Sequence, residues 1–329
     1  MKKNILFVIL LMAMTSVARA NDGRVVLQSK GTVRFFDALA LNEAVAAAVE
    51  GDTIDLADGT FYNTYGLTID KNILLRGKSA DKLAGTPYTN VNNDVTITST
   101  CKVEGIYFTS SVKVTKSAPG LRFTSCSFYD LTFSVDMPGM TIERCWIRNN
   151  MCLDNLTSKD INVNNCIIHY MYGGNDESRP CTFRNCNIAN AYSYGNGANE
   201  TWVDKMINCI LEANYCESNN IWGCLYSNVA ANCLRNANWG ITASGTIYYF
   251  NRNDGKDMLF TNPSRGTCSY TKEELIERGY LGTDGTVVGI EGGAYPYTLT
   301  PLNTQITTSV LTVDETTKKV TVDVEVNVK

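Results

Sequence analysis

Two polar, glycine-rich stretches in the middle of the chain contain the residues best suited to contacting a ligand. Residues 172–180 read Tyr-Gly-Gly-Asn-Asp-Glu-Ser-Arg-Pro, and residues 191–202 read Ala-Tyr-Ser-Tyr-Gly-Asn-Gly-Ala-Asn-Glu-Thr-Trp. Glycine, asparagine and serine favour turns, and aromatic and polar side chains on turns are typical of recognition loops. The sequence therefore predicts a ligand-binding site with these candidate residues: Tyr170, Tyr172, Asp176, Glu177, Tyr192, Tyr194, Glu200 and Trp202.

Catalytic residues are harder to assign than binding residues. Glycoside hydrolysis uses two carboxyl groups at a defined separation across a cleft. Asp176 and Glu177 are instead neighbours on one stretch, which is typical of solvated surface acids. The single histidine, His169, lies in a Cys-Ile-Ile-His-Tyr segment, where a structural side chain is favoured over a general base. The catalytic residues therefore stay unassigned.

The chain has no recognisable metal or cofactor motif. Residues 253–257 read Asn-Asp-Gly-Lys-Asp and supply oxygen ligands of the kind that Ca²⁺ prefers, but the spacing to a glutamate that an EF-hand requires is missing. Zinc sites use paired cysteines or clustered histidines, and the sequence contains no Cys-x-x-Cys pair. We expect no cofactor, with calcium as the open alternative.

The elements that position these residues follow from a repeat of about twenty residues. Cysteines recur at intervals of 19, 21, 20, 23 and 24 residues, at Cys126, Cys145, Cys166, Cys186 and, more loosely, Cys209 and Cys233. Apolar residues stand five and three positions before the cysteine and two after it, which is the alternation of short strands on either side of a bend. The chain is therefore an array of similar units.

A unit of this length closes into a coil of short strands. Twenty extended residues have a contour of about 66 Å, so the unit must bend several times. Stacked coils let each strand pair with its copy in the next coil and bury the inward side chains. Neighbouring rungs lie about 4.8 Å apart, whereas a disulfide needs a Cβ separation of about 3.8 Å. The stacked cysteines are therefore predicted to be thiols.

Asparagine precedes four of the repeated cysteines. It tolerates left-handed backbone, and its side chain bonds backbone groups, so a ladder of turn residues is predicted at Asn165, Asn185, Asn208 and Asn232. The remaining cysteines lie off the ladder, and some of them could be bridged: Cys101, Cys152, Cys181, Cys216, Cys224 and Cys268.

Two features of the repeat leave alternatives open. A leucine-rich repeat shares part of the pattern, but it needs a leucine eight residues before the cysteine, where the chain has Ala118, Met137, Ser158 and Ser178. The positions six residues after each cysteine include four consecutive aromatic residues, in a series of Thr132, Met151, Tyr172, Tyr192, Tyr215 and Trp239. These rings form either an inward stack, which is favoured, or an outward platform for sugar rings.

The segment before the array resembles a known family. An alanine-rich amphipathic helix over residues 37–49 would cap the exposed strand edges of the first coil. Within residues 42–77, Asn-Glu-Ala-Val, Gly-Asp-Thr-Ile, Asp-Gly-Thr-Phe-Tyr and Leu-Thr-Ile-Asp-Lys-Asn-Ile-Leu-Leu-Arg-Gly follow in order. This order resembles the opening of pectin-lyase-like right-handed parallel β-helix proteins, including chondroitinase B-like polysaccharide lyases.

The resemblance implies carbohydrate as the commonest substrate class, with calcium-assisted elimination or acid hydrolysis as the usual chemistry. The catalytic signatures of those families do not carry over. The chain has neither the paired Lys and Arg motif of the lyases nor the Asn-Thr-Asp, Asp-Asp and Gly-His-Gly set of the polygalacturonase-like hydrolases.

The segment after the array contains three further features. Thr271 to Glu274 is a capping box that opens a short helix ending at Gly279, which could cover the other end of the coil. Residues 287–296, Val-Val-Gly-Ile-Glu-Gly-Gly-Ala-Tyr-Pro, resemble the closing segment of uncharacterised exported β-helix proteins. Residues 306–313 and 320–328 alternate as a β-hairpin, which must pack on the last coils, on a docking partner or on another copy.

The first twenty residues have the order of a secretory signal peptide cut near Ala20. Their apolar run is shorter than the roughly 20 residues of a membrane span. Removing Lys2, Lys3 and Arg19 leaves 26 basic against 33 acidic residues, a net charge of −7, which offers no basic face for nucleic acid. We expect a secreted, periplasmic or outer-surface protein.

Together these features predict an all-β protein: a right-handed single-stranded parallel β-helix with a short N-terminal capping helix and a C-terminal β-hairpin. Its expected divisions are a signal peptide (1–20), the β-helix domain with its capping helix (21–300) and the hairpin (301–329). The leading hypothesis is a protein that binds or processes polysaccharide along a solenoid face. The alternatives are a polysaccharide lyase or glycoside hydrolase of unrecognised type, and a structural or adhesive surface protein.

Overall fold

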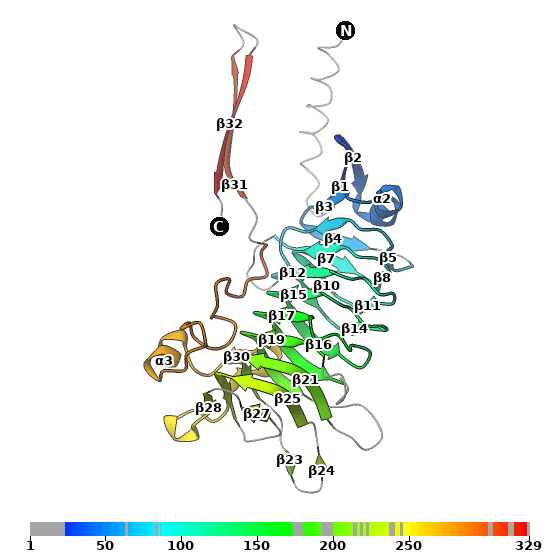
Figure 1. Cartoon of the computed structure of the whole chain (residues 1–329). Coiled ribbons are helices and arrows are strands. Elements are labelled where there is room, and N and C mark those ends of the chain that lie inside the picture. Colours follow the sequence, from blue (N-terminus) through cyan, green and yellow to red (C-terminus); the bar gives the residue numbers. More distant parts are fainter. Residues whose placement is uncertain are drawn as a thin grey trace.

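The chain folds into a coil of short strands stacked along one axis (Figure 1). The computed structural model describes residues 24–62, 65–82, 85, 87–173, 180–191, 200–212, 216–217, 220–221, 224–236, 241–243, 246–301, 305–314 and 319–327. Within these residues, no helix is long and apolar enough to cross a membrane.

One side of the coil is a 12-stranded sheet, called sheet A. Its members pair in parallel from β3 onward, whereas β1 pairs antiparallel with both β2 and β3. In spatial order the strands are β2 (Thr32–Asp37), β1 (Arg24–Ser29), β3 (Thr53–Leu56), β6 (Leu74–Arg76), β9 (Lys102–Glu104), β12 (Arg122–Thr124), β15 (Thr141–Glu143), β17 (Asn162–Asn164), β19 (Thr182–Arg184), β21 (Glu200–Ile207), β25 (Cys224–Ala231) and β27 (Ile241–Ala243).

The other sides form a branched 14-stranded sheet, called sheet B. Its main path is β4 (Gly59–Tyr62), β7 (Thr89–Asn92), β10 (Ile106–Phe108), β13 (Ser127–Phe128), β16 (Trp146–Cys152), β18 (Ile167–Tyr172), β20 (Asn187–Ala191), β22 (Ile210–Leu211), β26 (Cys233–Arg235) and β28 (Ile247–Tyr249). Its branch is β5 (Leu67–Ile69), β8 (Val95–Ile97), β11 (Val112–Val114) and β14 (Leu131–Phe133), which joins β16. The predicted parallel β-helix is confirmed.

The repeated cysteines lie inside the coil, one above another. The described ladder residues, from Cys126 to Cys233, are all fully buried and are free thiols. The Cys126 amide donates to the Cys145 sulfur at 3.4 Å, and the Cys145 amide donates to the Cys166 sulfur at 3.4 Å. The predicted thiol ladder is confirmed. Four of the other cysteines are also unbridged: Cys101, Cys152, Cys181 and Cys268.

The residue before each cysteine bends the chain at the same corner of every turn. Its φ is positive at Ser125, Arg144, Asn165, Asn185, Asn208 and Asn232, with values between 50° and 57°. Left-handed backbone costs a residue with a Cβ roughly 1 kcal/mol or more, and asparagine tolerates it best among such residues. The predicted asparagine turn ladder is therefore confirmed, and serine and arginine occupy the same corner in the two preceding turns.

Helices cap the N-terminal end of the coil. The 3-10 helix η2 (Ala38–Ala40) continues directly into α2 (Leu41–Ala47), so the expected helix over residues 37–49 is confirmed but is shorter and begins as a tighter helix. Leu41, Ala44 and Val45 face the interior and are buried. This apolar face covers the first coil in the way that the sequence predicts.

A second helix covers the side of the coil. Beyond η3 (Arg252–Asp254), β29 (Phe260–Asn262), η4 (Pro263–Arg265) and β30 (Thr267–Cys268) lies α3 (Lys272–Glu277), and β29 pairs antiparallel with β30. The Thr271–Glu274 capping box is present. Leu275 of α3 packs with Ile210 and Leu234, which project outward from sheet B. The expectation that this helix covers the far end is therefore wrong (Figure 1).

Residues 280–301, the C-terminal strap, run back along the corner formed by the asparagine ladder. Asn232 donates to the Leu281 carbonyl at 2.8 Å, and Asn165 donates to the Gly292 carbonyl at 2.7 Å. At the far end of the strap, the Ala80 amide donates to the Leu299 carbonyl at 2.9 Å. The strap therefore ties the last turns of the coil to the first ones.

The chain ends in an antiparallel hairpin of β31 (Gln305–Asp314) and β32 (Lys319–Asn327), which confirms the predicted pairing. The two strands form a two-stranded sheet of their own, as do β23 (Cys216–Glu217) and β24 (Asn220–Ile221).

Glycine in the strap is required for its close approach to the ladder. A Cβ on Gly289, whose φ is +81°, would lie 2.5 Å from Asn187 Oδ1, whereas a Cβ on Gly285, whose φ is +77°, would meet nothing within 4 Å. We expect Gly285→Ala to cost about 1 kcal/mol of unfolding free energy, the price of left-handed backbone. Gly289→Ala should cost a further 1 to 3 kcal/mol through overpacking. Urea denaturation measures the unfolding free energy of both variants. Equal losses of unfolding free energy in the two variants would contradict the role of the contact between Gly289 and Asn187.

The buried thiols should make the fold sensitive to alkali. Burial raises the pKa of Cys101 to about 12 and that of Cys152 to about 11. A folded-state pKa above the unfolded one contributes stability that is complete below about pH 9 and is lost as pH rises toward the folded value. We expect the unfolding free energy to fall by about 1.4 kcal/mol per pH unit for each such thiol. Urea denaturation at several pH values between about 9 and 11 measures this dependence. In Cys101→Ala the unfolding free energy should fall less steeply with pH than in the unaltered protein, and an equally steep fall would contradict the assignment.

Candidate functional site

The outer face of sheet B contains a cleft of about 780 Å³. Its floor is a column of outward side chains from four consecutive turns, which pair in register: Trp146 with Ile167, Ile167 with Asn187, and Asn187 with Ile210. Each of these residues directly follows a ladder cysteine, and alternation along the strand turns it outward when the cysteine points inward. The volume lies in the range of small-molecule sites.

Two segments that are distant in sequence form the walls of the cleft. Residues 265–275 line one side, and residues 288–299 of the C-terminal strap line the other. Asn187, which is almost fully buried, joins both walls to the floor: its Nδ2 donates to the Gly266 carbonyl at 2.7 Å, and its Oδ1 accepts from the Ile290 amide at 3.2 Å. The Trp146 indole donates to the Ser264 carbonyl at 2.8 Å. The walls are therefore held by defined polar contacts.

The groups that line the cleft include acids, bases and phenols. Asp81, Glu273 and Glu291 contribute carboxylates, and Arg265 and Lys272 contribute cations. Two tyrosines complete the lining, Tyr270 and Tyr297. Burial raises the pKa of Tyr297 well above its usual range, so this phenol stays protonated at neutral pH and can donate a hydrogen bond.

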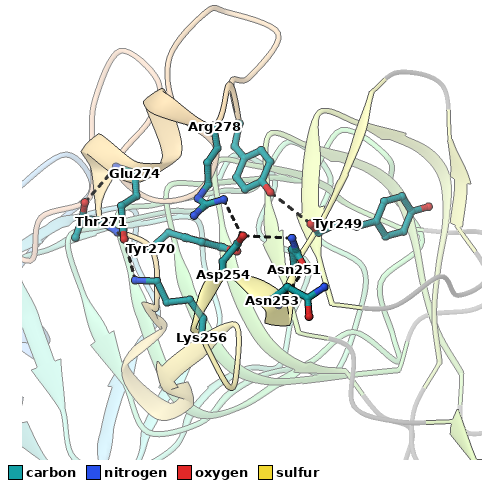
Figure 2. A network of polar contacts seen from close by, with 10 residues as sticks. Tyr249, Asn251, Asn253, Asp254, Lys256, Tyr270, Thr271, Glu274 and Arg278 are labelled. Carbon is teal, nitrogen blue, oxygen red and sulfur yellow. Dashed lines mark hydrogen bonds and ion pairs between the residues drawn. The ribbon is translucent and has the colours of Figure 1, made fainter.

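A network of charged groups fixes the wall at Tyr270 (Figure 2). Asp254 accepts from the Tyr270 hydroxyl at 2.8 Å and pairs with Arg278 at 2.7 Å. Lys256 pairs with Glu274 at 3.0 Å, and the side chains of Lys256 and Arg278 lie over the Tyr270 ring at 5.5 and 5.0 Å. Burial, followed by the bond to Asp254, raises the pKa of Tyr270. These contacts fix α3 and η3 against each other.

The Asp254 carboxylate belongs to the segment that the sequence offered as a calcium ligand. In the structure it accepts from Asn251 as well as from Tyr270 and Arg278. Within the described residues, no three His, Cys, Asp or Glu side chains group as a metal ion would require.

An arginine-centred cluster adjoins the cleft on the same face. The Arg148 guanidinium lies 4.1 Å from the centre of the Tyr107 ring and 5.7 Å from that of Tyr129. Its Nε donates to Ser127 Oγ at 3.1 Å, and its terminal nitrogen donates to the Phe108 carbonyl. Tyr129 is 45% exposed, so one aromatic ring of the cluster faces solvent.

Apolar packing connects this cluster to the cleft. Tyr107, Ala80 and Leu299 form a buried group against which Tyr88, Trp146 and Tyr297 pack. The cleft and the Arg148 cluster are therefore neighbouring parts of one surface.

His169 lies beside Arg148 on the outer face. Its Nδ1 contacts the Arg148 carbonyl at 3.1 Å, and because a carbonyl only accepts, Nδ1 is the protonated nitrogen. Burial lowers the pKa of His169, so the ring is neutral at pH 7 and its Nε2 is an acceptor. Nearby, Asp130 accepts from Asn149 and from the backbone and side chain of Asn150.

The structure describes four of the eight site residues that the sequence predicted, one of them only in its backbone. Tyr170 contacts His169 with ring centres 3.9 Å apart and ring planes tilted by 36°. Tyr172 ends β18, and the backbone amide of Trp202 donates to the neighbouring Gly173 carbonyl at 3.2 Å, so Tyr172 and Trp202 lie near each other and apart from the cleft lining. Asp176, Glu177, Tyr192 and Tyr194 lie outside the described residues, and Glu200 is described only in its backbone.

The expected alignment of residues six positions after each cysteine is wrong at Met151. Met151 pairs with Met171, whereas Tyr172 pairs with Cys152, which in turn pairs with Thr132. The cause is a register shift between Ile147 and Asn150. Met171 is buried and points inward, so alternation places the half-buried Tyr172 on the outer side. This contradicts, for Tyr172, the inward stack of aromatic rings that the sequence favoured.

The cleft residues were missed although part of their signal is in the repeat. The position after each cysteine reads Ser127, Trp146, Ile167, Asn187, Ile210 and Leu234, and its outward direction follows from the strand alternation. The walls give no such signal, because they come from segments outside the repeat. No family model, curated protein or solved structure matches the chain.

We expect Asn187 to stabilise the walls of the cleft more than it stabilises the strands of the coil. Asn187→Ala removes the bonds to Gly266 and Ile290, so backbone amides in residues 264–268 and 288–292 should exchange with deuterium faster while the ladder strands stay protected. Asn162→Ala, which removes an exposed bond to Asp160 on sheet A, is the matched control. Uniform acceleration in both variants would contradict this role.

Proposed function

We propose that this protein is an exported polysaccharide-binding β-helix of the pectin-lyase-like kind, and that it binds its ligand in the cleft on sheet B. The observation that carries the proposal is the lining of the cleft, which combines the half-buried aromatic ring of Trp146 with the exposed carboxylates of Glu273 and Glu291. Binding sites that combine apolar surface with a few convergent polar groups are the usual form of small-molecule sites.

Of the four floor residues, Trp146 is half-buried, whereas Ile167, Asn187 and Ile210 are almost fully buried. A sugar ring would therefore contact the cleft at Trp146 and along the walls, where Glu273 and Glu291 are exposed. The Trp146 and Tyr297 rings offer apolar faces, and the carboxylates of Asp81, Glu273 and Glu291 accept hydrogen bonds from hydroxyl groups. The Arg148 cluster with its exposed Tyr129 extends the same surface beyond the cleft.

Export is consistent with the cysteine chemistry. A secretory signal over residues 1–20 would deliver the chain to an oxidising compartment, where accessible thiols form disulfides. The ladder thiols are fully buried, and buried thiols in apolar surroundings are inert. We therefore place the protein in the periplasm, at the outer cell surface or outside the cell.

A glycoside hydrolase is the second candidate, because the cleft collects three carboxylates. Hydrolysis requires a carboxylic acid to protonate the leaving oxygen and a carboxylate to act as base or nucleophile. Glu273 on one wall and Glu291 on the other supply such groups, and Asp81 also lines the cleft. Polysaccharide elimination, the other chemistry of the family that the chain resembles, would release unsaturated products and is therefore distinguishable.

A tryptophan exchange tests the location of the site. Trp146→Ala removes the aromatic floor and should weaken binding to a glycan-array hit at least tenfold, since a ring contact of about 1.5 kcal/mol or more gives that factor. Trp202→Ala is the matched control, because Trp202 is a half-buried tryptophan on sheet A, and it should bind as the unaltered protein does. Calorimetry with the identified glycan measures both.

The outcomes separate the hypotheses. If only Trp202→Ala lost binding, the result would indicate that the ligand binds at the loops over residues 172–180 and 191–202, which the sequence favoured. Shortened glycans in the reaction mixture would establish a hydrolase, and unsaturated ends would establish a lyase. No binding to any array glycan would contradict the proposal.

A further inference from the structure

Within the described residues, strand β2 is an open edge at the N-terminal end of the coil (Figure 1). It begins the strand order of sheet A, with β1 as its neighbour. Its side chains Val33 and Phe35 are 55% and 71% exposed, and Leu39 in the following η2 is 74% exposed. Edge strands with large exposed apolar side chains are templates for pairing with another chain.

The edge lacks the features by which proteins usually prevent such pairing. Residues 32–37 read Thr-Val-Arg-Phe-Phe-Asp, with no proline and no lysine, and β2 pairs with β1 over its whole length without a bulge. Its two faces are distinct. Phe36 packs against the core with Arg34 over its ring at 5.0 Å, so Val33 and Phe35 project from the opposite face.

We infer that the occupant of this edge is the β2 strand of a second copy, paired antiparallel about a two-fold axis. A two-fold axis between antiparallel strands is perpendicular to the sheet and places one residue opposite itself. The charges of the strand exclude two of the residues that could occupy this position. Pairing centred on Arg34 or on Asp37 would set like charges directly opposite each other, which is destabilising.

Among the centres that avoid both conflicts, Phe35 pairs the longest part of β2, residues 33–37, whereas Phe36 pairs only residues 35–37 and Val33 only residues 32–34. It places Phe35 opposite Phe35 of the partner subunit, an aromatic cross-strand pair of the stabilising kind. Arg34 then lies opposite Phe36 of the partner subunit, which repeats the arginine–phenylalanine contact within each copy. Sheet A would continue across the interface, and the exposed edges of two coils would cover each other.

Sedimentation of the purified protein tests the assembly. A two-fold dimer is expected at micromolar concentration, and Phe35→Lys should shift it to monomer because two ammonium groups would meet at the axis. Tyr295→Lys is the control, since Tyr295 is 64% exposed on the strap, and it should remain dimeric. Circular dichroism establishes that both variants fold. A monomeric native protein, or a dimer that survives Phe35→Lys, would overturn the inference.

Cross-linking tests the register independently. Opposite residues in an antiparallel pair have Cβ atoms about 5 Å apart, so Phe35→Cys should form an intersubunit disulfide under mild oxidation. Two copies of Val33→Cys would lie four residues apart along the strand, about 13 Å, and should not cross-link. The native chain, in which ten cysteines are buried or half-buried, gives the background. Cross-linking of Val33→Cys instead of Phe35→Cys would overturn the register.

Discussion

The left-handed corner before each cysteine is the constraint on which the structure depends. Successive turns stack in register only if each one bends at the same place, and the positive φ values from Ser125 to Asn232 mark that place. The corner directs the next residue, the cysteine, into the core and the one after it outward. It thereby defines both the thiol ladder and the floor of the cleft. Where asparagine occupies the corner, its side chain also provides the polar groups to which the strap binds.

The fold could be predicted from the sequence because the signals that indicate it are local and recur in every unit. Cysteine spacing gave the turn length, the flanking alternation gave the strands, and asparagine gave the corner. The extra residue in β16 that displaces Met151 from its expected alignment with Thr132 and Tyr172 could not be predicted, since a bulge depends on how two neighbouring strands pair. The role of α3 was also misjudged, because Leu275 has equal apolar character whether it covers an end or a side of the coil.

The cleft was less predictable than the fold for a physical reason. Its floor is encoded in the repeat at the position of Trp146 and Asn187, but a floor alone is a flat sheet. The walls come from segments that follow the array by many residues, and their placement depends on tertiary hydrogen bonds such as those of Asn187 to Gly266 and Ile290. Sequence reasoning instead favoured loops rich in glycine and tyrosine, whose composition indicates exposure without indicating which segments converge.

The strap has a consequence for how this chain can change during evolution. Solenoids usually gain or lose whole units by duplication and deletion, because each unit contacts only its neighbours. Here one segment spans from Asn232 to Ala80 and contacts intermediate turns along its path. An added unit would lengthen that path by about 4.8 Å, so the strap would need one or two more residues at the same time. The number of coils is therefore coupled to the length of a segment that lies outside the repeat.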